Sequence, residues 1–215
     1  MADQPVAELI REAIIRGEFA PDQRLVEADL SARFGAPRAA VRSALVELTG
    51  EGLVERVANR GARVRAVSLA EAVEICEVRM VVEGLCAAKA AERIDADQRA
   101  ELRALGDAMR REVAASDLIG YSRSNHLLHL RVREIGGQGT AAAVLERLRA
   151  QNVRHRFRLA MQPGRPAVGL PEHLAIIDAV CGGDPAAAEA AMRAHLASVI
   201  AALTEIGDDP GLRLV

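Results

Sequence analysis

The chain has 215 residues, which is long enough for two modest domains that each bury their own core. Its 28 basic and 30 acidic residues give a formal net charge of −2, and this balance excludes a protein that coats nucleic acid without reading its sequence. Only 2% of the residues are aromatic, so the core has to consist of aliphatic side chains, as in packed helices.

Three amphipathic helices are predicted in the first fifty residues. The first, over 5–16, carries one apolar stripe, and the second, over 25–34, ends at Gly35, a residue suited to a left-handed turn. The third helix, over 37–51, has apolar residues spaced at i, i+3, i+4 and i+7, namely Val41, Ala44, Leu45 and Leu48. Two helices joined by so tight a turn form a helix-turn-helix.

A β-hairpin is predicted directly after the third helix. Residues 53–57 and 62–67 alternate between apolar and polar around the turn residues 58–61. A helix-turn-helix followed by such a hairpin is a winged helix, and its second helix enters the DNA major groove. Arg38 and Arg42 lie one turn apart on the outer face of that helix, where arginine can read guanine O6 and N7. Isolated exposed arginines are usually only solvated, but the adjoining turn and wing favour DNA contact here.

This N-terminal pattern resembles the DNA-binding domain of the GntR family of bacterial transcription regulators. The resemblance rests on residues 14–25, Phe34-Gly35, Arg38, Val41-Arg42, Ala44-Leu45, Leu48, 51–56 and Gly61. It implies that Arg38 and Arg42 contact DNA and that Gly61 is the wing tip near the minor groove. Arg24, ahead of the second helix, and Arg60, in the hairpin turn, complete the basic set that we expect to bind DNA.

From residue 68 onward the pattern is helical throughout. Ser68 followed by Glu71 is a capping-box signature, so we place a boundary between a domain at 1–67 and a second domain at 68–215. Helices are predicted at 69–93, 95–115, 117–135, 140–162, 168–182 and 184–206. Six helices with short connections predict an all-α bundle, and the whole chain is expected to be mainly α.

Several polar residues fall on apolar helix faces of the second domain. Arg79 and Glu83 lie one turn apart on an apolar stripe, which predicts either an internal salt bridge or a cavity where Arg79 binds an anion. Asn152 and His155 fall on an apolar face of the helix at 140–162. Polar groups that point into a bundle are how ligand and metal sites are built in all-α proteins.

Three of the predicted helices each carry a histidine that could point at one place. Asn125 and His129 are four residues apart and share a helix face, while His173 and His195 lie on the last two helices. Spacing alone leaves two interpretations open, hydrogen-bonded structural histidines or metal ligands.

The second domain resembles the effector-binding FCD domain of the FadR subfamily. The resemblance rests on Tyr121, Asn125, His129, Glu172-His173, Ile176, Ala179, 182–184, Ala187, Ala191-Met192 and His195-Leu196. In many members an Asp or Asn and three His at these positions hold a divalent metal, which implies Asn125, His129, His173 and His195 as ligands. Such a set suits zinc or nickel and leaves coordination positions open for water or a carboxylate.

Two classes of function are compatible with these patterns. The first is a transcription regulator, expected to be a repressor, in which a homodimer binds a palindromic double-stranded DNA operator. A small organic acid, bound near the metal by Arg79 and Asn152, would then release it. The second is a metal-dependent hydrolase or oxygenase. Against an enzyme, no Glu or Asp lies within a turn of His129 or His195 on the same face, and Glu172 is expected to point away.

A third possibility is a DNA-binding protein whose metal only holds the fold.

No apolar run approaches the roughly 20 residues of a membrane span, and the N-terminus shows no basic-then-apolar signal. We therefore expect a cytoplasmic protein without a membrane partner.

Overall fold

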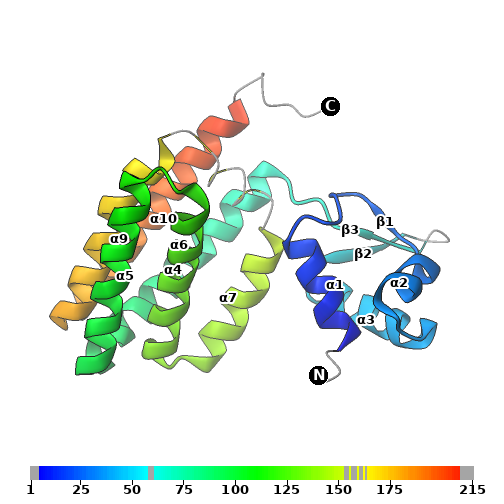
Figure 1. Cartoon of the computed structure of the whole chain (residues 1–215), viewed down its shortest axis with the longest axis horizontal. Helices are drawn as coiled ribbons and strands as arrows, with labels where there is room; N and C mark the ends of the chain where they lie inside the picture. Colours follow the sequence, from blue (N-terminus) through cyan, green and yellow to red (C-terminus); the bar gives the residue numbers. More distant parts are fainter. Residues whose placement is uncertain are drawn as a thin grey trace. The chain divides into compact units, whose positions relative to one another are not determined.

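The computed structural model describes residues 5–57, 61–152, 155, 159, 162 and 164–208. The chain forms two compact units, Met1–Ser68 with Arg149–Arg154, and Leu69–Leu148 with His155–Val215. The second unit begins at Leu69, close to the boundary placed from the sequence, but residues 149–152 group with the first unit, which no sequence pattern indicated. Figure 1 shows the elements of both units.

The first unit consists of three helices and a small antiparallel sheet. The elements are α1 (Val6–Ile15), β1 (Arg24–Leu25), α2 (Glu27–Phe34), α3 (Arg38–Gly50), β2 (Val54–Val57) and β3 (Gly61–Val64). Their buried aliphatic side chains form one core that includes Ile10, Ile14, Leu25, Leu30, Val41, Leu45, Leu48, Val54 and Val64. Gly35 ends α2 in the left-handed conformation, as predicted, and allows α3 to begin three residues later.

The sheet is larger than the predicted hairpin. Its strand order is β1-β3-β2, and β1 pairs with β3 through Arg24 opposite Arg63 and Leu25 opposite Ala62. The predicted helix start at residue 25 was therefore wrong, because α2 begins at Glu27. A two-residue strand is too short to show an alternating pattern in the sequence. β1 forms because its backbone pairs with the free edge of β3.

The second unit is a helical bundle. Its helices are α4 (Leu69–Arg93), α5 (Ala96–Ala114), α6 (Leu118–Gly136), α7 (Gly139–Gln151), α9 (Arg165–Gly182) and α10 (Pro185–Asp208). Helix α4 packs against α6, α9 and α10, while α5 packs against α6 and α9 (Figure 1). The core contains many small and aliphatic residues, including Ala87, Ala90, Leu102, Met109, Leu128, Val132, Ile176, Val180 and Leu196.

Two predicted boundaries of the bundle helices differ from the structure by three residues or more. The fourth helix of the bundle was predicted over 140–162, whereas α7 ends at Gln151, and part of the stretch after it lies outside the described residues. The fifth was predicted from residue 168, whereas α9 begins at Arg165. Pro166 favours this earlier start, since the first turn of a helix needs no backbone N–H donor.

Helix α10 corrects the expectation about apolar runs. Its segment Pro185–Glu205 is long and apolar enough to cross a membrane by length and composition. Within the bundle, however, α10 packs along α4 and α9 and buries Met192, His195 and Leu196. A core helix of a soluble protein passes the same compositional test, so the match is weak evidence for a membrane span.

Candidate nucleic-acid interface and candidate metal centre

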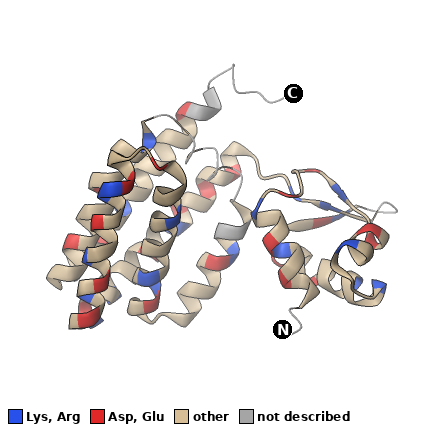
Figure 2. Cartoon of the chain, in the orientation of Figure 1, with Lys and Arg blue, Asp and Glu red and all other residues tan. Residues whose placement is uncertain are grey.

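The outer face of α3 is exposed and basic. Val41, Ala44, Leu45 and Leu48 are buried, as the periodicity predicted, and this packing fixes which side of the helix faces outward. Arg38 and Arg42 are on that exposed side together with the small residues Ala39 and Ser43. In Figure 2 the positions of arginines and of acidic residues are interspersed along the ribbon of this unit. The charge pattern therefore suits recognition by individual side chains.

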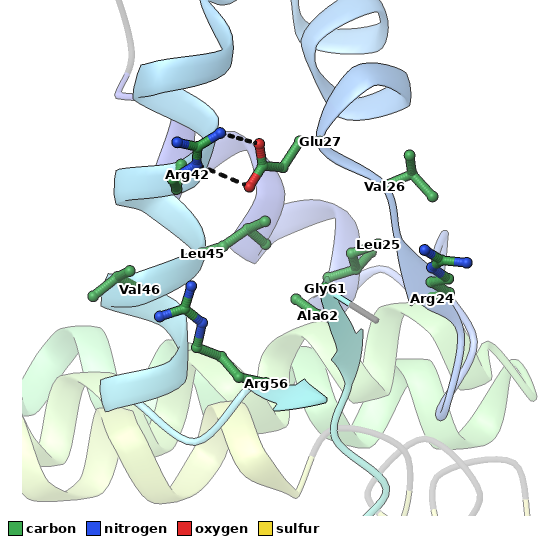
Figure 3. Close-up of a pocket in the computed structure, with 10 residues that line it drawn as sticks. All are labelled: Arg24, Leu25, Val26, Glu27, Arg42, Leu45, Val46, Arg56, Gly61 and Ala62. Carbon is green, nitrogen blue, oxygen red and sulfur yellow. Dashed lines mark hydrogen bonds and ion pairs between the residues drawn. The ribbon is translucent and has the colours of Figure 1, made fainter. Parts of the chain in front are cut away.

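A pocket of about 210 Å³ lies beside α3, between this helix and the sheet (Figure 3). Its lining residues are Arg24, Leu25, Val26, Glu27, Arg42, Leu45, Val46, Arg56, Gly61 and Ala62. The structure thus brings together three of the predicted DNA-binding residues, Arg24, Arg42 and Gly61. Arg56, which the sequence also offered as part of a local basic patch, joins them, whereas Arg60 lies outside the described residues.

Glu27 holds Arg42 through two hydrogen bonds. Arg42 donates from Nε to Glu27 Oε1 at 3.1 Å and from Nη2 to Glu27 Oε2 at 2.9 Å. Hydrogen bonding to Arg42 lowers the pKa of the Glu27 carboxyl, and Arg38 and Arg56 contribute through their charge. Glu27 was not among the site residues predicted from the sequence, because its partner lies on another helix, 15 residues away.

Three buried histidines meet inside the bundle. His129 on α6, His173 on α9 and His195 on α10 each offer a ring nitrogen, and these three atoms lie within 4.8 Å of one another. The ring centroids are 4.4 to 5.9 Å apart. The three predicted histidine ligands are therefore brought together, and Asn125 lies half-buried one turn before His129 on α6.

Each histidine uses its Nδ1 atom for a contact with a neighbouring side chain. His129 Nδ1 lies 2.5 Å from Glu83 Oε2, and His195 Nδ1 lies 2.8 Å from Glu172 Oε2. The third contact joins His173 Nδ1 to the Tyr121 hydroxyl at 2.8 Å. Hydrogen bonds of this kind fix the orientation and tautomer of histidines that bind metal through the other nitrogen.

Gly169 makes room for the contact between Tyr121 and His173. It lies one turn before His173 on α9, and a Cβ at this position would lie only 2.9 Å from the Tyr121 hydroxyl oxygen. The sequence shows neither this close approach nor the role of Tyr121, because both depend on how α6 packs against α9.

The electrostatic environment keeps Glu83 ionised and favours the neutral forms of His129 and His173. Burial opposes the charge of Glu83, but Arg79 and His129 outweigh it and hold the pKa of this carboxyl well below its ordinary value. Burial lowers the pKa of His129 to about 4, although Glu83 acts in the opposite direction. Burial, His195 and His129 also lower the pKa of His173 well below its ordinary value. Neutral imidazole is the form that binds a metal.

The cluster has the properties of a transition-metal site. Within the described part of the chain, the Nε2 atom of His173 is buried and has no hydrogen-bond partner, although such atoms are normally paired. A metal ion would satisfy this atom. Three imidazoles with hydrogen-bonded Nδ1 atoms match the ligands that zinc and nickel prefer.

The carboxylates near the cluster correct one argument made from the sequence. Glu172 was expected to point away, but it accepts a hydrogen bond from His195 and pairs with Arg165 at 3.2 Å. Glu83 reaches His129 from a different helix, α4. Both carboxylates contact Nδ1 atoms, so they orient the histidines, and their positions do not make them general bases for a metal-bound water.

The two candidate effector contacts lie in different units. Arg79 is buried and forms the internal salt bridge with Glu83 that the sequence suggested as one alternative, at 2.7 Å between Nη2 and Oε1. It therefore connects through Glu83 to His129. Asn152 is fully buried just after α7 and groups with the first unit. Its assignment as an effector contact stays a prediction.

Comparison with known families identifies both units. Residues 3–64 match the family model described as bacterial regulatory proteins, gntR family, and residues 74–198 match the FCD domain. The chain belongs to the GntR family. It is a transcription regulator with a C-terminal FCD domain and not an enzyme, as the sequence patterns predicted.

Relatives of this GntR regulator extend over nearly the whole chain. The HTH-type transcriptional repressor RspR of Escherichia coli is 26% identical over 95% of this chain and 90% of its own length. An HTH-type transcriptional regulator of Streptomyces ambofaciens is 31% identical over 88% of this chain and 80% of its own length. The solved structure of E. coli McbR/YncC has the same fold, with a TM-score of 0.81 at 18% identity over 97% of this chain and 99% of that one.

The buried pair of Arg79 and Glu83 predicts a large effect on stability. Replacing Arg79 by Met leaves a buried carboxylate without its cation, so we expect Arg79→Met to lower the free energy of unfolding by about 3 to 5 kcal/mol. Arg193 and Glu189 provide the control, because they form an ion pair at the same spacing but are exposed. Arg193→Met should change stability by no more than about 0.5 kcal/mol in urea unfolding. Equal effects of the two substitutions would contradict this role of Arg79.

Proposed function

We propose that this protein is a homodimeric repressor that binds a palindromic DNA operator and is released by a small organic acid bound at a metal site in the FCD domain. The observation that carries the proposal is the cluster of His129, His173 and His195, each held by a hydrogen bond at Nδ1.

DNA reading is assigned to the exposed face of α3. Arg38 and Arg42 are on this face, and the small side chains of Ala39 and Ser43 allow a DNA groove to come close. The guanidinium of arginine pairs with guanine O6 and N7 through two hydrogen bonds. Arg24, Arg56 and Gly61 at the neighbouring pocket, together with Arg60 of the wing, would contact the DNA backbone or the minor groove.

Dimerisation is assigned to an exposed apolar stripe of α4. Val78, Val81 and Leu85 are 48%, 53% and 44% exposed in the single chain and lie at i, i+3 and i+7, so they share one face of the helix. The opposite stripe of α4 is buried in the bundle. A second copy of the chain would cover the exposed stripe, and a two-fold dimer reads two half-sites in inverted repeat.

The response to effector is assigned to the histidine cluster. His129, His173 and His195 would hold zinc or nickel, with Asn125 as a fourth ligand, and the metal would supply a positive centre that attracts a carboxylate. Arg79, which reaches this centre through Glu83, is assigned to hold the remainder of the ligand. The histidines and Glu83 come from α4, α6, α9 and α10, so a ligand that repositions these side chains also moves helices. The difference between the ligand's affinities for the DNA-binding arrangement of the helices and for the released arrangement would set how completely the protein leaves the operator.

A purely structural metal is the second candidate role for the cluster. In that case the histidines would only hold the helices together, and no small molecule would affect DNA binding through them. The two roles differ in what happens when the metal is removed.

The first test concerns α3. A duplex selected from a random library by the wild-type protein, here called the selected duplex, serves as the DNA probe. We expect Arg42→Ala, and to a lesser degree Arg38→Ala, to weaken its binding by about 1 to 3 kcal/mol per half-site. Binding to a random duplex should fall much less. Equal losses on both duplexes in a gel-shift series would show that the arginines contact phosphates instead of bases.

The second test concerns the α4 stripe. Val81→Glu places a charge in the proposed dimer interface, so light scattering should show a monomer at micromolar concentration where the wild type is a dimer. Val168 on α9 is also 53% exposed, and Val168→Glu is the matched control that should stay dimeric. A dimeric Val81→Glu variant, or a monomeric wild type, would contradict this assignment.

The third test concerns the metal. The double variant His173→Ala/His195→Ala should contain no zinc or nickel by elemental analysis and still bind the selected duplex. It should no longer be released by any member of a panel of small carboxylic acids that releases the wild type. His126→Ala, at an exposed histidine outside the cluster, is the control and should behave as the wild type. Retained metal, or normal release without metal, would overturn the proposed switch.

A further inference from the structure

The contact between Glu27 and Arg42 uses only one edge of the guanidinium group. Arginine has five N–H donors in a planar fork. Glu27 accepts from Nε and from Nη2, so it occupies the side edge of Arg42 (Figure 3). Of the three N–H groups that Glu27 leaves unused, the terminal edge presents one from Nη1 and one from Nη2. These are two parallel donors of the kind that pair with guanine O6 and N7, so Glu27 and a guanine could bind Arg42 together.

The surroundings of the pair indicate what Glu27 contributes. The side chains of Arg42 and Glu27 are 63% and 36% exposed, so their ion pair adds little to the stability of the fold. Its main effect is to restrict the orientation of Arg42. Among the described residues that line the pocket, Glu27 is acidic while Arg24, Arg42 and Arg56 are basic. A carboxylate at this place repels phosphate groups and opposes contacts that carry no sequence information.

We propose that Glu27 is a specificity-determining residue that holds the side edge of Arg42, presents its terminal edge to a guanine and disfavours phosphate contacts by Arg42. This inference rests on the proposed DNA-reading role of Arg42. It predicts that Glu27 increases the ratio of affinities for the selected and the random duplex. Without Glu27, Arg42 would be free to bind phosphates near any sequence.

The test compares four variants with the wild type by fluorescence anisotropy over a series of salt concentrations. Glu27→Ala removes both acceptor oxygens, and Glu27→Gln removes the charge but keeps one. Glu18→Gln is the matched control, because Glu18 is also 36% exposed and pairs with an arginine of α2, Arg33. It removes the same charge from the same unit without releasing Arg42. Arg42→Ala tests the underlying assignment.

We expect Glu27→Ala to lower the ratio of affinities by roughly tenfold, with weaker binding to the selected duplex and stronger binding to the random duplex. Glu27→Gln should have an intermediate effect, and Glu18→Gln should leave the ratio within about twofold of the wild-type value. A new selection from the random library with Glu27→Ala should show a relaxed preference at one guanine per half-site.

Three outcomes would overturn the inference. Tighter binding of Glu27→Ala to the selected duplex with an equal or higher ratio would mean that Glu27 competes with DNA for Arg42. A relaxed preference at a second base would mean that Glu27 contacts DNA itself. If Glu27→Ala changed the ratio of affinities no more than Glu18→Gln does, the contribution of Glu27 would be only that of its net charge. If Arg42→Ala leaves the ratio unchanged, the DNA-reading role of Arg42 fails as well, so the two failures can be told apart.

Discussion

The bundle depends on how its buried polar groups are paired. Burying a charge or a polar atom without a partner destabilises a protein, and here Arg79, Glu83 and three histidines lie within the bundle. Arg79 neutralises Glu83, and Glu83 in turn orients His129. On another side of the cluster, Arg165 pairs with Glu172, which orients His195. The same hydrogen bonds that make burial tolerable leave one nitrogen of each imidazole for another ligand. The stability of the bundle and the arrangement of the three histidines therefore have a common origin.

The N-terminal unit uses charge differently. Arg33, Arg42 and Arg63 are exposed and paired with exposed carboxylates, so these ion pairs contribute little to stability. The aliphatic core under α3 fixes which face of that helix is presented, and the sheet places Arg24, Arg56 and Gly61 beside it. The fold determines where the arginines are, whereas contacts such as that from Glu27 determine their orientation.

The sequence predicted the periodic features and missed those that depend on tertiary contacts. Helix α4 was predicted with its observed ends, because apolar residues recur over 25 residues and the flanking residues break the pattern. The histidines at 129, 173 and 195 were grouped through a family resemblance, and the bundle brings them together. The short strand β1 left no pattern, since it exists only through its pairing with β3.

The partners of the histidines were also beyond the reach of the sequence. Glu83 reaches His129 across 46 residues, and Tyr121 reaches His173 across 52 residues. The side chain of Glu172 was predicted to point away from the histidines. That prediction considered only its sequence neighbour His173 and not His195 on α10, which it contacts. Spacing along one helix indicates which residues share a face, but it does not indicate what the next helix places opposite that face.

The central claim is that His129, His173 and His195 hold a metal through the nitrogens that their hydrogen-bonded Nδ1 atoms leave available. X-ray absorption spectroscopy at the zinc edge, on protein loaded with one zinc per chain, tests it directly. The account predicts three imidazole nitrogens at about 2.0 to 2.1 Å, completed by oxygen ligands. A spectrum with fewer than three imidazoles, or with sulfur at about 2.3 Å, would contradict it.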